Sequence, residues 1–297
     1  MKKYLKFLLE ELIFQNRIQY HKGINITSYL KPDKLLIGFF VSVYLYMNQR
    51  VNILGTQVSS ISSSDLLAAF KIAIQAKKLI QVAITPVNSI LAAYKNPQVQ
   101  EAYNTADYVL CDGMPVKWAA AFLNTPIIER ITGLDLLPEL VAFAANESFT
   151  VFLLGASPGV GEKLKDVILS QHPNCKIVGI YVPPFMPVFD AVENKKMVDA
   201  VHAAAPDIVL VSLTAPKQDL WITQNKAQLH PALYVGIGGA FEVMAGLAKR
   251  APKWMHGAGL EWLYRLIQEP KRMYRRYLIE APLFIPLVIR QKLFSIK

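Results

Sequence analysis

The sequence predicts an α/β fold: a Rossmann-like, mostly parallel sheet with helices on both faces, followed by a helical, membrane-associating C-terminal appendage. Two observations predict the sheet. From residue 51 onward, short runs of Val, Ile and Leu alternate with longer helical stretches, which is typical of parallel strands joined by crossover helices. These runs are rich in Val, Ile and Leu, as in strands that are buried on both faces. A third observation, the basic and apolar C-terminal segment, predicts the appendage.

The first elements are bounded by turn and capping residues. Strand 51–54 ends at Gly55, and Ser64 with Asp65 begins a helix that continues to about residue 78. The next elements follow the same alternation of β-rich and helical runs: strand 81–85, helix 89–95, strand 106–111 ending at Asp112-Gly113, a helix through 118 and 122, and helix 134–146.

The second half repeats this pattern around Gly-rich and Pro-rich turns. Strand 149–155 opens the turn GASPGVG, and the Pro-rich stretch PPFMP follows strand 175–181. The remaining elements alternate as before: helix 160–171, helix 195–204, strand 207–213, a helix from about 218, and strand 232–238.

Composition and charge bound the class of protein. The 297 residues, 53% hydrophobic and 18% charged, are enough for a full core and exclude disorder for most of the chain. Two cysteines, Cys111 and Cys175, cannot build a disulfide framework, which favours a reducing compartment. The formal charge of +10 belongs to the ends: residues 1–50 hold eight basic and three acidic side chains, and residues 248–297 hold eleven and three.

We therefore divide the chain into a basic, apolar N-terminal extension (1–50), an α/β core (51–247) and a basic, apolar appendage (248–297). Such ends beside a nearly neutral core favour an anionic membrane surface over nucleic acid as partner. The apolar run 35–47 covers only about 20 Å as a helix, too little for a bilayer. The start reads as an amphipathic helix, not a secretory signal.

The C-terminal tail, residues 277–290, is interrupted by Pro282 and Pro286 and is expected to lie in a membrane interface. Leu283, Phe284 and Leu287 are the expected membrane contacts. The alternative stays open that both ends of the chain pack on the domain or on a partner chain.

Polar residues follow the predicted strands at their carboxyl ends, where ligands bind in open parallel sheets. They are Thr85 with Asn88, Asp112 with Gly113, Gly155, Thr214 with Lys217 and Gln218, and the glycines 236, 238 and 239. Each of these residues could be only a turn residue, but together they predict a site along one rim of the sheet.

Several chemistries are not supported by the motifs. GASPGVG matches neither the dinucleotide fingerprint nor the phosphate loop. The five histidines are scattered and no D-x-D pair occurs, so we expect neither a metal ion nor a cofactor. No Ser-His-Asp arrangement can be identified. Cys111 is interpreted as a small core residue, not as a nucleophile.

Asp112 is the best catalytic candidate, because a carboxylate at the end of an apolar strand is partly desolvated and gains basicity. The arginines 265, 272, 275 and 276 come next. Three of them, at positions i, i+3 and i+4, can share a helix face, and Pro270 separates them from Arg265. Guanidinium groups suit diphosphate oxygens. The alternative is a solvated basic face or a lipid-headgroup patch.

In sequence order, these motifs resemble the WecG/TagA/CpsF family of bacterial glycosyltransferases (glycosyltransferase family 26) over roughly residues 51–278. The matching segments are Thr85 with Asn88, ADYVLCDGMPV, ERITGLDLLPEL, VFLLGASPGV, APKQD, VGIGGAFEVMAG, RAPKW and GLEWLYRLIQEPKRMYRRYL. Two positions depart from the family pattern: Asp219 stands where a glutamate is usual, and the Thr-to-Asn spacing is one residue longer, which makes Asn88 less secure than Thr85.

The resemblance implies roles for individual residues. Asp112 takes the place of the general base, and Thr85, Asn88, Arg130 and Gln218 take places in the substrate pocket. We add Gly155 and Gly239 to that pocket as glycines of the rim. In the family, arginines of the appendage neutralise the leaving diphosphate in the absence of a metal. Their places are taken here by Arg265, Arg272 and Arg275.

The resemblance also implies the reaction. A hexose or N-acetylhexosamine, most readily of the N-acetylmannosamine type, would move from a UDP-sugar to an undecaprenyl-diphosphate-linked sugar at the cytoplasmic face of the membrane, in cell-surface polysaccharide synthesis. The protein would be a peripheral membrane enzyme, and a homo-oligomer stays open. The alternatives are a non-catalytic membrane scaffold of the same fold and a nucleotide-dependent oxidoreductase, although the dinucleotide fingerprint is missing.

Overall fold

The computed structural model describes residues 49–252, 254–255 and 259–294, except for the side chain of Arg272. The chain divides into two compact units, Met1–Gln49 and Arg50–Lys297, and all described elements belong to the second. The N-terminal amphipathic helix and the apolar run 35–47 of the sequence analysis lie outside the described residues.

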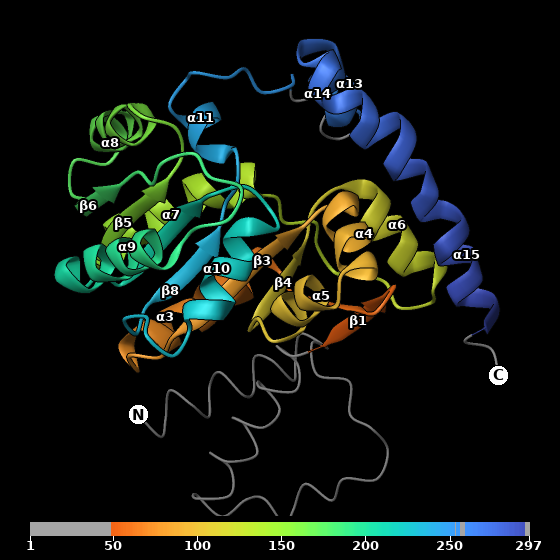
Figure 1. The fold of residues 1–297 in the computed structure, drawn as a ribbon, viewed down its shortest axis with the longest axis horizontal. Coiled ribbons are helices and arrows are strands. Elements are labelled where there is room, and N and C mark those ends of the chain that lie inside the picture. Colours follow the sequence, from red (N-terminus) through yellow and green to blue (C-terminus); the bar gives the residue numbers. More distant parts are fainter. Residues whose placement is uncertain (1–48, 253, 256–258, 295–297) are drawn as a thin grey trace, which may run out of the picture. The chain divides into compact units, whose positions relative to one another are not determined.

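A six-stranded parallel sheet forms the centre of this unit (Figure 1), which confirms the predicted α/β fold with a parallel sheet. The strands in spatial order are β4 (Tyr108–Cys111), β3 (Ile80–Thr85), β8 (Leu233–Gly236), β7 (Ile208–Ser212), β5 (Thr150–Gly155) and β6 (Lys176–Tyr181). Every neighbouring pair runs parallel. The inner strands β8 and β7 are buried at every position, as their unbroken apolar runs predict.

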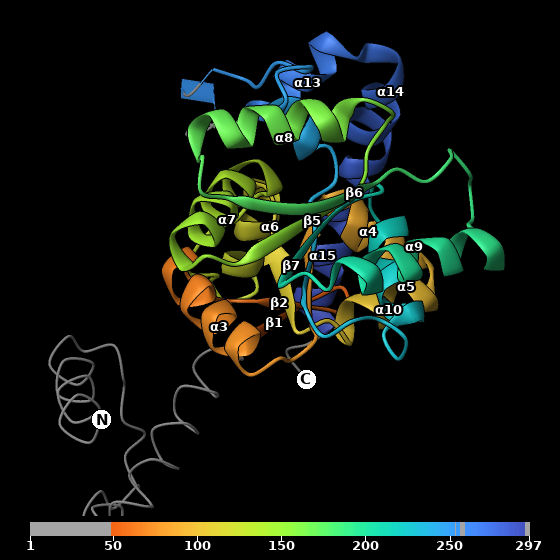
Figure 2. The ribbon, with the colours of Figure 1, turned by 90° about the vertical axis from the view of Figure 1, so that its left-hand side faces the viewer.

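Helices cover both faces of the sheet (Figure 2). One layer contains α3 (Ser63–Gln75), α7 (Gly133–Glu147) and α8 (Val160–Gln171), and the opposite layer contains α5 (Pro97–Asn104), α9 (Ala191–Ala204) and α10 (Lys217–Asn225). Three further helices lie close to the ends of β3, β4 and β8: α4 (Val87–Lys95), α6 (Met114–Phe122) and α11 (Ala240–Met244). This arrangement leaves the carboxyl ends of the strands along one rim.

The strand predicted at 51–54 does not join this sheet. It forms β1 (Arg50–Ile53), which pairs antiparallel with an unpredicted strand, β2 (Thr56–Ser59). The turn between them is Leu54-Gly55, and both residues have positive φ (52° and 89°), as in the mirror-image turns that suit two-residue hairpins. The hairpin was not predicted because the sequence of β2 is polar.

Helix α5 was also not predicted, although its start follows standard capping rules. The side chain of Asn96 accepts a hydrogen bond from the backbone N–H of Gln98 at 2.9 Å, and Pro97 occupies the first helical position. The preceding helix α4 ends only two residues before α5 begins. The sequence pattern of the two helices therefore resembles that of a single helix followed by a loop.

The C-terminal residues form a chain of short helices. They are α13 (Glu261–Gln268), α14 (Pro270–Tyr274), a π-helical segment (Arg275–Glu280), a 3₁₀ turn (Ala281–Leu283) and α15 (Phe284–Phe294). The prediction that Pro270 begins a new helix is confirmed. Over the described residues, none of the helices combines the length and the apolar character that crossing a bilayer requires.

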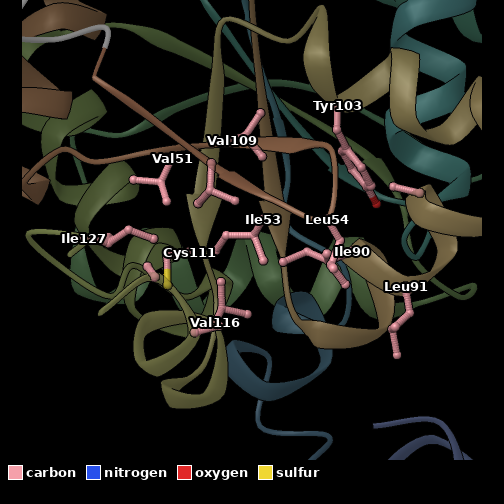
Figure 3. Packing of buried hydrophobic residues seen from close by; sticks show 14 of the residues in the cluster. Val51, Ile53, Leu54, Ile90, Leu91, Tyr103, Val109, Cys111, Val116 and Ile127 are labelled. Carbon is pink, nitrogen blue, oxygen red and sulfur yellow. The ribbon is translucent and has the colours of Figure 1, made fainter. Parts of the chain in front are cut away.

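Helix α15 packs on the protein, so part of the predicted membrane contact is wrong. Phe284 and Val288 are 3% and 5% exposed and belong to a hydrophobic cluster with β1, β4, α4 and α6, in which Leu287 is partly buried. Figure 3 shows core residues of this cluster, Cys111 among them. The Gln291 side chain accepts a hydrogen bond from Leu54 N–H and donates one to the Asn52 carbonyl, both at 2.8 Å. The alternative of packing on the domain therefore holds for this face of the tail.

Asp219, the residue that departs from the family pattern, is fully buried at the start of α10. Tyr103 Oη donates a hydrogen bond to Asp219 Oδ2 at 3.4 Å, and Asp219 Oδ1 has no partner among the residues described. Burial raises the pKa of the Asp219 carboxyl to about 8, against the smaller opposing effects of the Tyr103 hydrogen bond and the residue's own backbone. Asp219 is therefore a neutral acid at pH 7.

We expect the free energy of unfolding of the wild type to decline with rising pH because of Asp219, and we expect Asp219→Asn to remove this decline. Between the ordinary carboxyl pKa, about 4, and about 8, folded Asp219 keeps a proton that the unfolded chain releases. The free energy of unfolding of the wild type should therefore fall across this window by up to about 1.4 kcal/mol per pH unit. Denaturant midpoints at several pH values measure this slope. A slope equal to that of wild type would contradict the prediction, and Asp199→Asn, at an exposed ion pair, is the control.

Candidate functional site

The candidate site lies where β3 and β4 end. Thr85, the last residue of β3, is fully buried, and its Oγ1 donates a hydrogen bond to the Leu110 carbonyl at 2.9 Å. The backbone N–H of Asp112 donates to the Thr85 carbonyl at 3.3 Å. Gly113, with φ of +95°, then turns the chain into α6. Asp112 is thereby held at the rim directly beside Thr85.

The charges of four side chains act on the Asp112 carboxyl. Burial raises its pKa above the ordinary value, the positive charge of Arg265 opposes this most strongly, and the negative charge of Glu261 adds to it. Arg276 and Arg130 oppose the rise more weakly. The neighbouring Cys111 stays a neutral thiol, since burial raises its pKa to about 12. Asp112 is therefore a carboxylate of raised basicity surrounded by arginines, an arrangement that suits proton abstraction beside a bound anion.

A second carboxylate, Asp135, fixes Arg130 and a further arginine, Arg250. Asp135 lies in the first turn of α7, where Thr132 caps the helix and donates to Asp135 Oδ2 at 2.8 Å. Arg130 approaches the same oxygen at 3.5 Å, and Arg250 donates to Asp135 Oδ1. The pKa of the Asp135 carboxyl is lowered overall. Desolvation acts to raise it, but the hydrogen bonds from Arg250 and Thr132 and the arginine charges outweigh this effect. Asp135 is thus an ionised anchor for arginines.

The rim at β5, β7 and β8 is built from closely packed loops. From β5 the chain moves outward to β6, and from β7 it moves the opposite way to β8, so a topological switch point lies between them. Gly155 has φ of +101°, and a Cβ there would lie 2.5 Å from the Ser212 carbonyl oxygen. Gln218 is 1% exposed, and its Oε1 accepts a hydrogen bond from Gly238 N–H at 3.1 Å. Gly155 and Gln218 therefore shape the loops of the rim.

The remaining predicted site residues lie in different settings. Asn88 is partly exposed in the first turn of α4, and Gly239 is exposed immediately before α11. The side chain of Arg272 lies outside the described residues. Arg275 is exposed and donates from Nε to Glu280 at 3.2 Å, whereas the charge of Arg276 acts on the Asp112 carboxyl. Thr85 adjoins Asp112, and the charges of Arg130, Arg265 and Arg276 act on that carboxyl.

Sequence reasoning did not assign site roles to Arg250 and Glu261. Both residues lie in segments that carry the family resemblance, RAPKW and GLEWLYR. A charged residue next to a glycine-rich or proline-rich turn was the sequence signal that could have identified them. In the described part of the chain, Arg250 Nε and Glu261 Oε1 are buried without a hydrogen-bond partner, and so are Arg276 Nε and Glu242 Oε2. Buried polar groups are rarely left unpaired unless a ligand, water or ion completes them.

The arrangement can bind a strongly anionic group next to a base. The charges of three arginines act on the basic carboxylate of Asp112, and the Nε donors of Arg250 and Arg276 are buried without a hydrogen-bond partner in the described residues. No group of three or more His, Cys, Asp or Glu side chains in the described residues is arranged to hold a metal ion. The model of one protein family matches residues 51–297, and its description is "Glycosyl transferase WecG/TagA/CpsF family".

Proposed function

The chain belongs to the WecG/TagA/CpsF glycosyl transferase family, and from this premise we propose that it transfers a hexose or N-acetylhexosamine from a UDP-sugar to an undecaprenyl-diphosphate-linked sugar. An N-acetylmannosamine-type donor is the first candidate. Family membership by itself means a glycosyltransferase with a sugar donor and an acceptor, a class that serves polysaccharide synthesis. The observation that carries the finer proposal is Asp112, a carboxylate at the strand ends whose pKa is raised by burial and whose ionised form is favoured by the charges of three arginines.

In the proposed mechanism, Asp112 removes the proton from the acceptor hydroxyl as its oxygen attacks the anomeric carbon of the donor. The bond from that carbon to the UDP oxygen breaks, and UDP leaves with the bonding electrons. Arg265 and Arg276 neutralise the diphosphate as its negative charge grows, so the displacement proceeds without a metal ion. Asn88 and Arg130, the latter held by Asp135, border the pocket, and the buried Thr85 supports it through its hydrogen bond to the Leu110 carbonyl.

The appendage also supports a peripheral position at the cytoplasmic face of the membrane. Large apolar side chains stay exposed along α13, the π-helical segment and α15: Ile267, Leu278, Ile279, Leu283, Ile285, Ile289, Leu293 and Phe294. Arg290 is exposed among them. Exposed apolar and basic side chains on short helices are typical of segments that lie in a lipid interface. Such a surface would keep the enzyme near its lipid-linked acceptor.

Arg276→Ala should weaken the use of the donor far more than Arg275→Ala. The two residues are adjacent and identical in type, but Arg276 faces Asp112 and Arg275 pairs with Glu280 at the surface. We expect the KM for the UDP-sugar to rise about tenfold in Arg276→Ala, as for loss of one charged contact, and to change less than about twofold in Arg275→Ala. Steady-state kinetics with varied donor measures both. The reverse order would favour the assignment carried over from the family.

The test of the proposed function is UDP release from a panel of UDP-sugars with one lipid-linked acceptor, in the presence of EDTA. We expect acceptor-dependent UDP release with at least one donor. If no donor yields UDP with the acceptor while the protein is folded, the non-catalytic scaffold is supported. If release occurs only after a divalent metal is restored, the arginine account is wrong.

A further inference from the structure

Glu261 is a carboxylate of the site for which the proposed reaction has no role so far. It is the first residue of α13, and its side chain is 18% exposed. Glu261 Oε1 is buried and lies 3.8 Å from Arg250 Nε and 4.0 Å from Arg265 Nη2. Both distances fit ion pairs but exceed hydrogen-bond length. Glu261 is thus attracted by two guanidinium groups without a hydrogen bond to either.

The two arginines beside Glu261 differ in how they are held. Arg250 is fixed to α7, because its Nη1 donates to the Leu134 carbonyl at 3.3 Å and its Nη2 donates to Asp135. Arg265 lies one turn after Glu261 on α13 and is partly exposed. Glu261 therefore connects Arg250, which is fixed to α7, with Arg265, which is partly exposed and able to turn toward a ligand.

Several arginines in one site have opposite effects on diphosphate binding and on the basicity of the general base. Arginines suit a diphosphate, but next to Asp112 they favour its ionised form and reduce its basicity. The charges that face Asp112 are those of Arg265 and Glu261 on α13, Arg276 on the π-helical segment and Arg130 ahead of α7. Glu261 is the negative member of this set, and it raises the pKa of Asp112.

We propose that Glu261 is a positioning residue: it holds Arg265 over the site while the donor is absent, and Arg265 leaves it for the diphosphate when the donor binds. Glu261 then stays paired with Arg250, which keeps α13 attached to the core. No covalent step is added. This inference rests on the proposed UDP-sugar donor, because a diphosphate is the anion that would compete with Glu261 for Arg265.

The test compares Glu261→Gln with Glu280→Gln. Both variants remove one Glu–Arg pair from the appendage, but Glu280 pairs with Arg275 at the surface. We expect Glu261→Gln to bind UDP about fivefold more tightly by calorimetry, because the competing carboxylate is gone. Turnover should fall several-fold, and the acidic limb of the pH–rate profile should move to lower pH, because Asp112 loses a negative neighbour. Glu280→Gln should match the wild type in all three measurements.

Each other outcome overturns the inference. If Glu261 has only a structural role, Glu261→Gln should bind UDP equally or more weakly and should keep the pH–rate profile of the wild type. A Glu261→Gln protein with wild-type UDP affinity and a wild-type pH–rate profile would therefore rule out the positioning role. If the wild type binds UDP but the variant binds it no more tightly, the inference alone fails. If the wild type binds no UDP at all, the proposed donor fails with it.

Discussion

Asp112→Asn is expected to reduce sugar transfer by about 10²–10⁴-fold, the usual cost of losing a general base. The amide has nearly the shape of the carboxyl group but cannot accept the proton of the acceptor hydroxyl. The backbone hydrogen bond from Asp112 to Thr85 survives the change, so the rim should keep its geometry. UDP release under saturating donor and acceptor measures the loss, and circular dichroism with a thermal midpoint verifies the fold.

The pH dependence of the wild type gives an independent check on the same residue. Asp112 must be ionised to act as a base, and its pKa is raised, so kcat/KM should fall on acidification at a pH above the ordinary range of aspartate. Asp199→Asn, at an exposed ion pair, is the control and should leave turnover unchanged. Turnover like that of the wild type in folded Asp112→Asn would refute the base assignment.

Phe284→Ala is expected to lower the free energy of unfolding by about 3–5 kcal/mol, as for other buried aromatic side chains. Phe284 is 3% exposed in the cluster that joins α15 to β1, β4, α4 and α6. The neighbouring Ile285 is 62% exposed, so Ile285→Ala should change stability by no more than about 0.5 kcal/mol. Denaturant unfolding of both variants measures the difference.

Vesicle co-sedimentation separates packing from membrane binding in the same pair of variants. Ile285→Ala should weaken binding to anionic vesicles slightly, because it removes apolar area from the exposed face. Phe284→Ala should keep most of this binding wherever it remains folded. A Phe284→Ala protein of unchanged stability that no longer binds vesicles would show that this side chain contacts lipid and not the core.

The helical appendage shows how a local rule can be overridden. The α-helical spacing of Arg272, Arg275 and Arg276 predicts a shared face. The structure has a π-helical segment from Arg275 to Glu280, in which residues five apart lie above one another. Arg275 therefore meets Glu280, and the charge of Arg276 acts on Asp112. The change of helix type brings Arg275 to Glu280, and no sequence spacing reveals it.

The sequence by itself determined the sheet and predicted the rim along which the candidate site residues lie. Unbroken Val, Ile and Leu runs can be satisfied only by strands covered on both faces, and parallel strands bring residues that follow them, such as Thr85 and Asp112, to one rim. Only the tertiary structure decided the antiparallel pairing of β1 with β2, the packing of Phe284 and the position of Glu261 between Arg250 and Arg265. These depend on contacts between segments far apart in the chain, and burial and charge pairing there are set by neighbours that local propensity cannot identify.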